Sequence, residues 1–194
     1  MTKFQAHVQR WSACRLCHLC DGRTQVVLCR GKLPCDVLMV GEAPGVSEDV
    51  IGQPFVGPAG QLLDSVVARA VEMADVVDVR FAFTNLCGCL PDKTAEDHAP
   101  PESSIRACRP RLEELVALAH PQLVVAVGNL ARDWLDRKRS GKLKKERHPV
   151  PEGVPIIDVT HPARVLRSDR SQQGLMRQRM AVTLAEAFQE LIPF

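Results

Sequence analysis

The stretch Val-Leu-Met-Val-Gly-Glu-Ala-Pro-Gly, residues 37–45, decides the fold of this chain. Its first four residues form a short apolar run, which is typical of a strand buried on both faces of a sheet. The glycines and the proline that follow predict a loop whose backbone approaches a ligand closely. A second loop rich in glycine and proline begins at Gly52, and a helix is predicted from near Pro58.

Phe55 lies in this second loop, between Pro54 and Gly57. A phenylalanine there either plugs the hydrophobic core or offers the face of its ring to a ligand. The glycine and proline on both sides favour the ligand platform, and the core plug stays open as the alternative.

Strand and helix patterns alternate along the rest of the chain. Short apolar runs predict strands at residues 37–41, 81–86, 123–128 and 155–160. Amphipathic stretches predict helices at residues 59–74, 103–119, 129–137 and 172–191. This order predicts a three-layer α/β/α fold with a mostly parallel, four-stranded central sheet.

Polar residues follow or end each predicted strand. Glu42 follows the first strand, Asn85 ends the second, Asn129 follows the third and His161 follows the fourth. Ligands of parallel sheets bind beyond the carboxyl ends of the strands, so these positions predict one site. Two simpler interpretations stay open: Asn85 could tie down its own loop, and His161 could begin a helix at a His-Pro turn.

The composition limits the class of protein. A chain of 194 residues with 45% hydrophobic content can bury the core of one domain, which we expect to span residues 1–194. It has no run of eighteen apolar residues and no signal-peptide pattern, so we expect a cytoplasmic protein without a membrane partner.

Positive charge is distributed unevenly along the chain. The net charge is +2, but residues 132–147 hold eight Lys or Arg against three Asp or Glu, and residues 164–179 hold five against one. Such clusters are either solvated surface or a seat for a phosphate backbone.

Eight cysteines in a chain expected in a reducing compartment indicate metal or cluster ligation rather than disulfides. Cys14 and Cys17 are spaced like a ligand pair, and Cys89 and Cys108 flank a polar insertion. These four thiols could hold a [4Fe-4S] cluster or zinc. Cys20 and Cys87 are the alternative ligands, and the remaining two cysteines are interpreted as small buried hydrophobes.

Several motifs together resemble the iron-sulfur uracil-DNA glycosylases of bacteria and archaea, called family 4. The likeness covers nearly the whole chain. The motifs are Cys14-x-x-Cys17, Gly41-Glu42-Ala43-Pro44-Gly45, Pro54-Phe55-Val56-Gly57, Thr84-Asn85, Ala107-Cys108-Arg109-Pro110 and His161-Pro162-Ala163-Arg164-Val165-Leu166-Arg167. The resemblance implies the glycosylase fold and a monomer that removes uracil from single- or double-stranded DNA by base flipping.

The resemblance also implies roles for individual residues. Phe55 would stack on the uracil, Asn85 would read its Watson-Crick edge and His161 would donate to its O2. Glu42 would orient the attacking water, with Glu48 and Asp49 as alternatives. Further residues are expected to bind substrate (Gly41, Ala43, Gly45) or DNA (Arg164, Val165, Leu166, Arg167).

In the better-known uracil glycosylases, an Asp stands at the position of Ala43 and a Tyr at that of Gly45. The resemblance implies a structural [4Fe-4S] cluster bound by Cys14, Cys17, Cys89 and Cys108, which joins an N-terminal arm of about residues 1–36 to the insertion. Two rival classes stay open: a non-catalytic protein that binds uracil-containing DNA or single strands, and a zinc-stabilised hydrolase of a small nucleotide.

Overall fold

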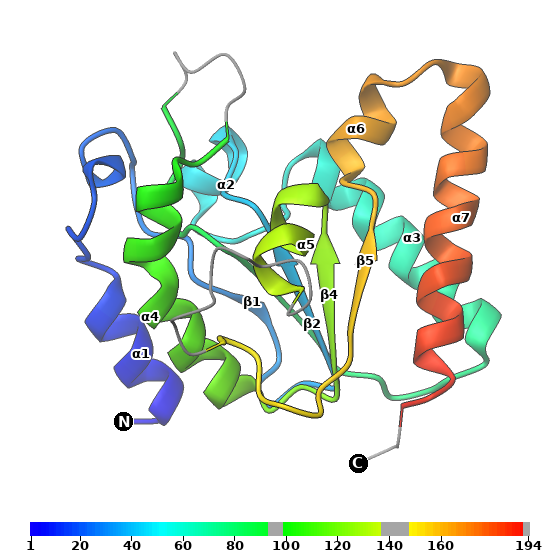
Figure 1. Ribbon diagram of the computed structural model, residues 1–194, viewed down its shortest axis with the longest axis horizontal. Helices are drawn as coiled ribbons and strands as arrows, with labels where there is room; N and C mark the ends of the chain where they lie inside the picture. The colour runs from blue at the N-terminus through cyan, green and yellow to red at the C-terminus, as the bar shows by residue number, and fades with distance from the viewer. Residues whose placement is uncertain (93–98, 137–147, 192–194) are drawn as a thin grey trace.

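The computed structural model describes residues 1–92, 99–136 and 148–191 (Figure 1). Within them, five strands form one sheet in the order β1-β3-β2-β4-β5. The strands are β1 (Arg30–Gly31), β2 (Val37–Gly41), β3 (Phe81–Asn85), β4 (Leu123–Val127) and β5 (Ile156–Val159). The four predicted strands pair in parallel, and β1 adds an antiparallel edge beside β3. The apolar pattern does not indicate β1, because two residues are too few to show a period.

β2 lies between β3 and β4, and all five of its residues are buried. Side chains alternate along a strand, so Val37 and Met39 pack into one apolar cluster while Leu38 and Val40 pack into another. Burial on both faces is the reason that this run is apolar throughout.

Helices cover both faces of the sheet, as Figure 1 shows. The face of Val37 and Met39 carries α3 (Pro58–Ala74), α6 (Pro162–Arg167) and α7 (Arg170–Phe188). The face of Leu38 and Val40 carries α4 (Glu102–Ala119) and α5 (Asn129–Leu135). The predicted three-layer α/β/α fold is therefore confirmed, with five strands in place of four.

The ends of these helices lie close to the predicted ones. Pro58 is at the start of α3, and Asp75 ends it in a left-handed conformation. The structure also contains short helices that were not predicted, because each has too few residues to show a helical period. They are η1 (His18–Cys20) and α2 (Val46–Ile51), whereas α6 is the helix that the His-Pro turn at His161 left open.

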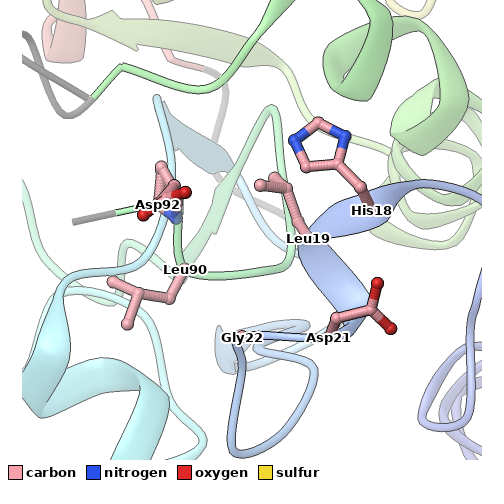
Figure 2. Close-up of a pocket in the computed structure, with 7 residues that line it drawn as sticks. His18, Leu19, Asp21, Gly22, Leu90 and Asp92 are labelled. Atoms are coloured by element: carbon pink, nitrogen blue, oxygen red, sulfur yellow. The ribbon is translucent and has the colours of Figure 1, made fainter. Parts of the chain in front are cut away.

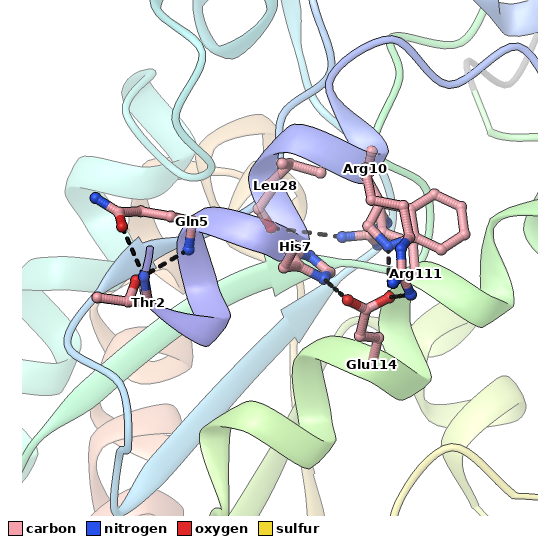
Figure 3. A network of polar contacts seen from close by, with 8 residues as sticks. Thr2, Gln5, His7, Arg10, Leu28, Arg111 and Glu114 are labelled. Carbon is pink, nitrogen blue, oxygen red and sulfur yellow. Dashed lines mark hydrogen bonds and ion pairs between the residues drawn. The ribbon is translucent and has the colours of Figure 1, made fainter.

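The N-terminal helix α1 (Lys3–Trp11) was not predicted either, and it packs against α4 (Figure 3). Oε2 of Glu114 on α4 accepts hydrogen bonds from the Arg10 guanidinium at 3.0 Å and from the Trp11 indole at 2.9 Å. His7 Nδ1 lies 3.4 Å from the other carboxylate oxygen. These contacts hold the first residues of the chain against the helix layer.

No helix within residues 1–92, 99–136 and 148–191 is both long enough and apolar enough to cross a membrane. The division of the chain into a single domain with an N-terminal arm of about residues 1–36 stays a prediction.

Candidate active site

A cavity of about 700 Å³ opens at the carboxyl ends of the parallel strands. It is lined by residues that follow or end each of the four parallel strands, together with the loop of Phe55 and the start of α6. These residues are Glu42, Ala43, Pro44, Gly45, Val46, Glu48, Phe55, Ala59, Gly60, Asn85, Leu90, Pro91, Asn129, Thr160, His161, Ala163, Arg164 and Arg167. The convergence expected from the parallel sheet is confirmed for Glu42, Asn85, Asn129 and His161.

Gly41 lies where two of the predicted substrate groups meet. A Cβ atom added to Gly41 would overlap both the Oδ1 atom of Asn85 and the ring of Phe55. Any larger residue would displace the amide or the ring. Glycine at this position therefore brings the end of β2, Asn85 and Phe55 together.

Phe55 combines the two roles that the sequence left open. Its ring is 7% exposed, packs against Phe83 with 6.0 Å between ring centroids, and also lines the cavity. Its backbone φ of 56° is unusual for a bulky residue and indicates local strain held by the surroundings. Gly60 is part of those surroundings, because a Cβ there would overlap the backbone of Phe55. The ring is thus both a core residue and a wall of the cavity.

Glu48 connects the two loops that form this wall. Its Oε2 atom accepts from the backbone N–H of Gly45 at 3.1 Å. Its Oε1 atom accepts from Val56 and Gly57 at 3.0 and 2.8 Å. Both oxygens accept from the backbone, so Glu48 holds the two loops together, while Glu42 stays the first candidate for orienting water and Glu48 the alternative.

Asp49 has a similar structural role on the other side of α2. Both of its oxygens accept from the Thr24 backbone N–H, at 2.9 and 3.0 Å, and its side chain is buried. Asp49 does not line the cavity. It joins α2 to the N-terminal arm, and the suggestion that it could activate water is wrong.

Glu42 and His161 flank the backbone of Gly128. A Cβ on Gly128 would lie 2.9 Å from Glu42 Oε1 and 3.0 Å from His161 Cβ, and the φ of Gly128 is 100°. Glycine therefore permits both side chains to approach the cavity from either side of the loop after β4. Burial raises the pKa of Glu42, although a hydrogen bond from the Leu130 backbone and the charge of Arg167 act in the opposite direction.

His161 is held as a neutral hydrogen-bond donor. Burial, assisted by the charge of Arg167, lowers the pKa of His161. Its Nδ1 atom accepts from the backbone N–H of Ala163 at 3.2 Å and so caps α6. In the neutral ring the proton is then on Nε2, which is free to donate into the cavity. His161 can therefore begin a helix and also offer a hydrogen-bond donor to a ligand.

Asn85 lies at the end of β3 and is 3% exposed. Its backbone carbonyl accepts a hydrogen bond from Arg111. Among the described residues, no protein group bonds to its side-chain amide, which faces the cavity beside Gly41. The amide is thus not used to tie down its own loop, and its donor and acceptor are left for a ligand.

The outer rim of the cavity comes from α6. Arg164 and Arg167 are exposed and line the cavity. Leu166 is 39% exposed, whereas Val165 is 0% exposed and packs in the core with α3 and α7. The expectation that Val165 contacts DNA is therefore wrong, because it points to the opposite side of α6 from the rim. The basic residues 137–147 lie outside the described residues.

A second cavity, of about 430 Å³, lies between η1 and the segment after β3 (Figure 2). It is lined by the carboxylates Asp21 and Asp92 and shares Leu90 and Pro91 with the first cavity. Its lining includes the imidazole ring of His18 but no Phe, Tyr or Trp ring and no Asn or Gln side chain, and its two acidic groups would repel a phosphate backbone. The cavity of Asn85 is therefore the candidate active site.

Comparison with known proteins agrees with this geometry. Residues 30–189 match the uracil DNA glycosylase superfamily. Over 164 residues the chain is 33% identical to the type-4 uracil-DNA glycosylase of Pyrobaculum aerophilum, which covers 79% of this chain and 80% of that protein. The chain belongs to the type-4 uracil-DNA glycosylase family. It is also 29% identical over 163 residues to the type-4 uracil-DNA glycosylase of Thermotoga maritima, which covers 82% of this chain and 81% of the relative.

In this type-4 family member, the four predicted cysteine ligands come from three segments. Cys14 and Cys17 of the N-terminal arm pack with Cys89 around Trp11. Cys108 lies in α4, within the helix predicted at residues 103–119. The charges of Cys17 and Cys108 both act on Cys89, so the sulfurs share one neighbourhood.

Protein donors point at two of these sulfurs. Arg23 Nη1 donates to Cys89 Sγ at 3.2 Å. Cys108 Sγ accepts from the Gly88 backbone N–H and from Arg111 Nε, both at 3.3 Å. Positive charge and N–H donors stabilise thiolates, which are the form of cysteine that binds iron or zinc.

The thiols in this neighbourhood differ in acidity. A hydrogen bond from Cys87 lowers the pKa of Cys108 to about 5, and the charge of Arg111 acts in the same direction. Burial raises the pKa of Cys89 to about 11, although the charge of Arg23 and its hydrogen bond act in the opposite direction. Cys87 thus lies beside the predicted ligands and remains an alternative, whereas the thiol of Cys20 donates to Asp21 at 3.3 Å.

Four thiols are donors that suit either an iron-sulfur cluster or a zinc ion. Within the described residues, no three His, Cys, Asp or Glu side chains converge closely enough to ligate one metal ion. A zinc ion needs each sulfur about 2.3 Å from one centre, whereas a cubane of four iron atoms keeps its cysteine sulfurs farther apart.

Several residues that contribute to this site were not predicted, and three of them are polar. Arg23 and Arg111 donate to the cysteine sulfurs, and Thr160 lines the cavity beside His161. The sequence carries no local signal for the arginines, because their partners are distant along the chain. Thr160 ends the fourth predicted strand, and its position could have indicated the site.

Proposed function

We propose that this protein is a DNA repair glycosylase that hydrolyses the N-glycosidic bond of uracil in DNA and leaves an abasic site. The observation that carries the proposal is the convergence of Glu42, Phe55, Asn85 and His161 on one cavity at the sheet edge. Phe55 and Asn85 can bind a pyrimidine ring by stacking and hydrogen bonding. Glu42 and His161 can stabilise the charges that develop when the glycosidic bond breaks. The cavity of about 700 Å³ has room for a flipped nucleotide.

Recognition of uracil rests on Phe55 and Asn85. The buried ring of Phe55 offers a rigid aromatic face, and stacking of one base on such a face contributes about 1–3 kcal/mol. The free amide of Asn85 presents an acceptor to uracil N3–H and a donor to O4. Cytosine presents an acceptor at N3 and a donor at N4, so the same amide orientation rejects it. Gly41, Ala43 and Gly45 complete the wall by leaving room for the ring.

Cleavage is assigned to His161 and Glu42. When the glycosidic bond breaks, negative charge gathers on uracil O2 and positive charge on the sugar. The Nε2–H of neutral His161 donates to that oxygen, which requires no protonation of the ring. The carboxylate of Glu42 orients water and stabilises the positive sugar, a role that requires the ionised form.

DNA is held by the rim of α6. Arg164 and Arg167 line the cavity, and in this proposal their guanidinium groups contact phosphates near the flipped nucleotide. The half-exposed Leu166 is the candidate wedge that fills the space left by the base. We propose that both single-stranded and duplex DNA are substrates, because the cavity requires only the extruded nucleotide.

We propose that Cys14, Cys17, Cys89 and Cys108 hold a [4Fe-4S] cluster, with zinc as the alternative. The thiol neighbourhood and the N–H donors to Cys89 and Cys108 support the cluster. Hydrolysis transfers no electrons, so the cluster would supply structure by joining the arm to α4. A monomer in the cytoplasm, where thiols stay reduced, completes the proposal.

The activity is tested with oligonucleotides that contain one uracil, single-stranded and paired, followed by alkali to break the abasic strand. We expect wild-type protein to release uracil from both and to leave thymine oligonucleotides intact. Asn85→Ala removes two hydrogen bonds to the base and lowers kcat/KM about 10- to 100-fold. The exposed Gln61→Ala on α3 serves as the control. If wild-type protein leaves the uracil oligonucleotides uncut, the proposal is refuted. Binding of these oligonucleotides without cleavage would identify a non-catalytic protein.

The metal is tested on protein purified without oxygen. Iron near four atoms per chain and broad visible absorption are expected for the cluster. A colourless sample that contains zinc would overturn the cluster assignment without affecting the glycosylase assignment.

A further inference from the structure

Arg111 is a buried arginine between the cysteine pocket and the candidate active site. It lies on α4, three residues after Cys108, and its side chain is 1% exposed. Figure 3 shows it beside the contact of α1 with α4. A buried guanidinium is costly unless its charge and all its N–H groups have partners, so its contacts report what it is there to hold.

The three nitrogens of Arg111 reach three different parts of the chain. Nε donates to Cys108 Sγ at 3.3 Å. Nη1 donates to Thr84 Oγ1 at 3.1 Å and to the Leu28 carbonyl at 3.4 Å. Nη2 donates to the carbonyls of Asn85 and Leu86. One side chain therefore contacts a predicted cluster ligand and the backbone of the residue that reads the base.

Among the described residues, the contacts of Arg111 include no carboxylate. Its partners at the end of β3 are neutral carbonyls and a hydroxyl, and Nε makes the remaining contact, with the sulfur of Cys108. The position of the guanidinium thus depends on the cysteine pocket.

The segment from Asn85 to Cys89 is also held on its other side. The backbone N–H groups of Leu86 and Cys87 donate to the carbonyls of Gly41 and Glu42, at 2.9 and 3.0 Å. The Asn85 end is therefore fixed between the β2 loop and Arg111. A shift of the guanidinium would move the carbonyl of Asn85 and, with it, the direction of the amide.

We propose that Arg111 is a positioning residue that couples occupancy of the cysteine pocket to the placement of Asn85, and hence to uracil binding. The inference rests on the proposed function. Coupling between two sites is reciprocal, so uracil in the cavity must also retain the metal in the pocket. A merely structural arginine would support the fold without linking the two equilibria.

Arg23 is the matched control. It also donates to a cysteine sulfur, Cys89, but its second hydrogen bond goes to the Cys14 carbonyl and not to β3. Arg23→Met should therefore change how firmly the metal is held without changing its link to uracil. Arg111→Met and Arg111→Lys should remove the link, because neither side chain can span the three groups.

The experiment measures the rate of iron release from the holoprotein to a chelator. One sample contains a single-stranded oligonucleotide with one 2′-fluoro-2′-deoxyuridine, whose fluorine opposes positive charge on the sugar and prevents cleavage. The reference sample contains the thymidine oligonucleotide. We expect the uracil analogue to slow iron release about tenfold in wild type and in Arg23→Met, but not in either Arg111 variant.

Two outcomes would overturn the inference. One is protection that persists in a loaded Arg111 variant, and the other is wild-type protein that releases uracil from DNA but gains no protection. If neither Arg111 variant retains iron, Thr84→Val removes the acceptor at 3.1 Å and keeps the contact with Cys108. Undiminished protection in Thr84→Val then refutes the coupling. Wild-type protein that neither cleaves nor binds uracil DNA instead refutes the proposed function.

Discussion

Replacing Glu48 by glutamine tests how the wall of the cavity is held. The carboxylate accepts three backbone hydrogen bonds, from Gly45, Val56 and Gly57, at 2.8 to 3.1 Å. Glutamine keeps one oxygen, but its NH₂ group then faces one of the N–H donors. One charge-assisted bond, from the Gly45 N–H, is lost, and the two from Val56 and Gly57 become neutral.

These losses set the size of the expected effect. A charge-assisted bond contributes about 1.5–3 kcal/mol and a neutral one about 1 kcal/mol, so Glu48→Gln should lower the free energy of unfolding by about 3 kcal/mol. For a chain of this size that corresponds to a fall in Tm of about 8 °C. Displacement of Phe55 should lose part of the stacking energy, and kcat/KM should fall about tenfold.

Urea unfolding and uracil-release kinetics on the same preparations measure both effects. Glu72→Gln is the control, because Glu72 is exposed on α3 and its change should cost less than about 0.5 kcal/mol. A Glu48→Gln protein as stable as the control would refute the clamp. Lost activity with unchanged stability would instead return Glu48 to the role of a group that acts on substrate.

The remaining predictions concern the two catalytic candidates and α6. Burial raises the pKa of Glu42, so kcat/KM should rise with pH through a value above that of an ordinary glutamate, a limb that Glu42→Gln removes. The pKa of Glu42 is higher in the folded protein than in the unfolded chain, so ionisation of Glu42 at neutral pH lowers the free energy of unfolding. Glu42→Gln should therefore be more stable than wild type at pH 7, and this difference should vanish at acid pH, where Glu42 is protonated in both states. His161→Ala should lower kcat about 100-fold and the free energy of unfolding by about 1 kcal/mol, because a donor and a helix cap are both lost, and a stability unchanged within error would refute the cap. Leu166→Ala should reduce cleavage of duplex DNA more than cleavage of single strands and leave the free energy of unfolding unchanged. Val165→Ala should lower the free energy of unfolding in urea by about 2 kcal/mol. If Val165→Ala instead impaired duplex cleavage and Leu166→Ala lowered stability, Val165 would again be the candidate wedge.

The sequence indicated the four parallel strands and the polar residue beyond each. That prediction succeeds because a strand buried on both faces must be apolar along its length, as residues 37–40 are. The carboxyl ends of parallel strands must also meet at one edge. Glu42, Asn85 and His161 are therefore brought together by topology alone.

Other roles depend on contacts between distant segments, which local patterns do not report. Glu48 and Asp49 look alike in the sequence as acids near a glycine-rich loop, yet both bind backbone N–H groups. Val165 and Leu166 are neighbours of similar chemistry, and only the packing of α6 on the core decides that one is buried and the other exposed. Arg111 was overlooked for the same reason.

By itself, the sequence determined which chemical groups are available and at which ends of which strands they stand, because apolar periodicity reflects the burial of regular elements. The tertiary structure alone decided how each group is used. It turns Phe55 into both core and cavity wall through a left-handed backbone, frees the amide of Asn85 and assigns a tautomer to His161. Those outcomes follow from side-chain directions and from hydrogen bonds between segments far apart in the chain, and both exist only after the layers have packed.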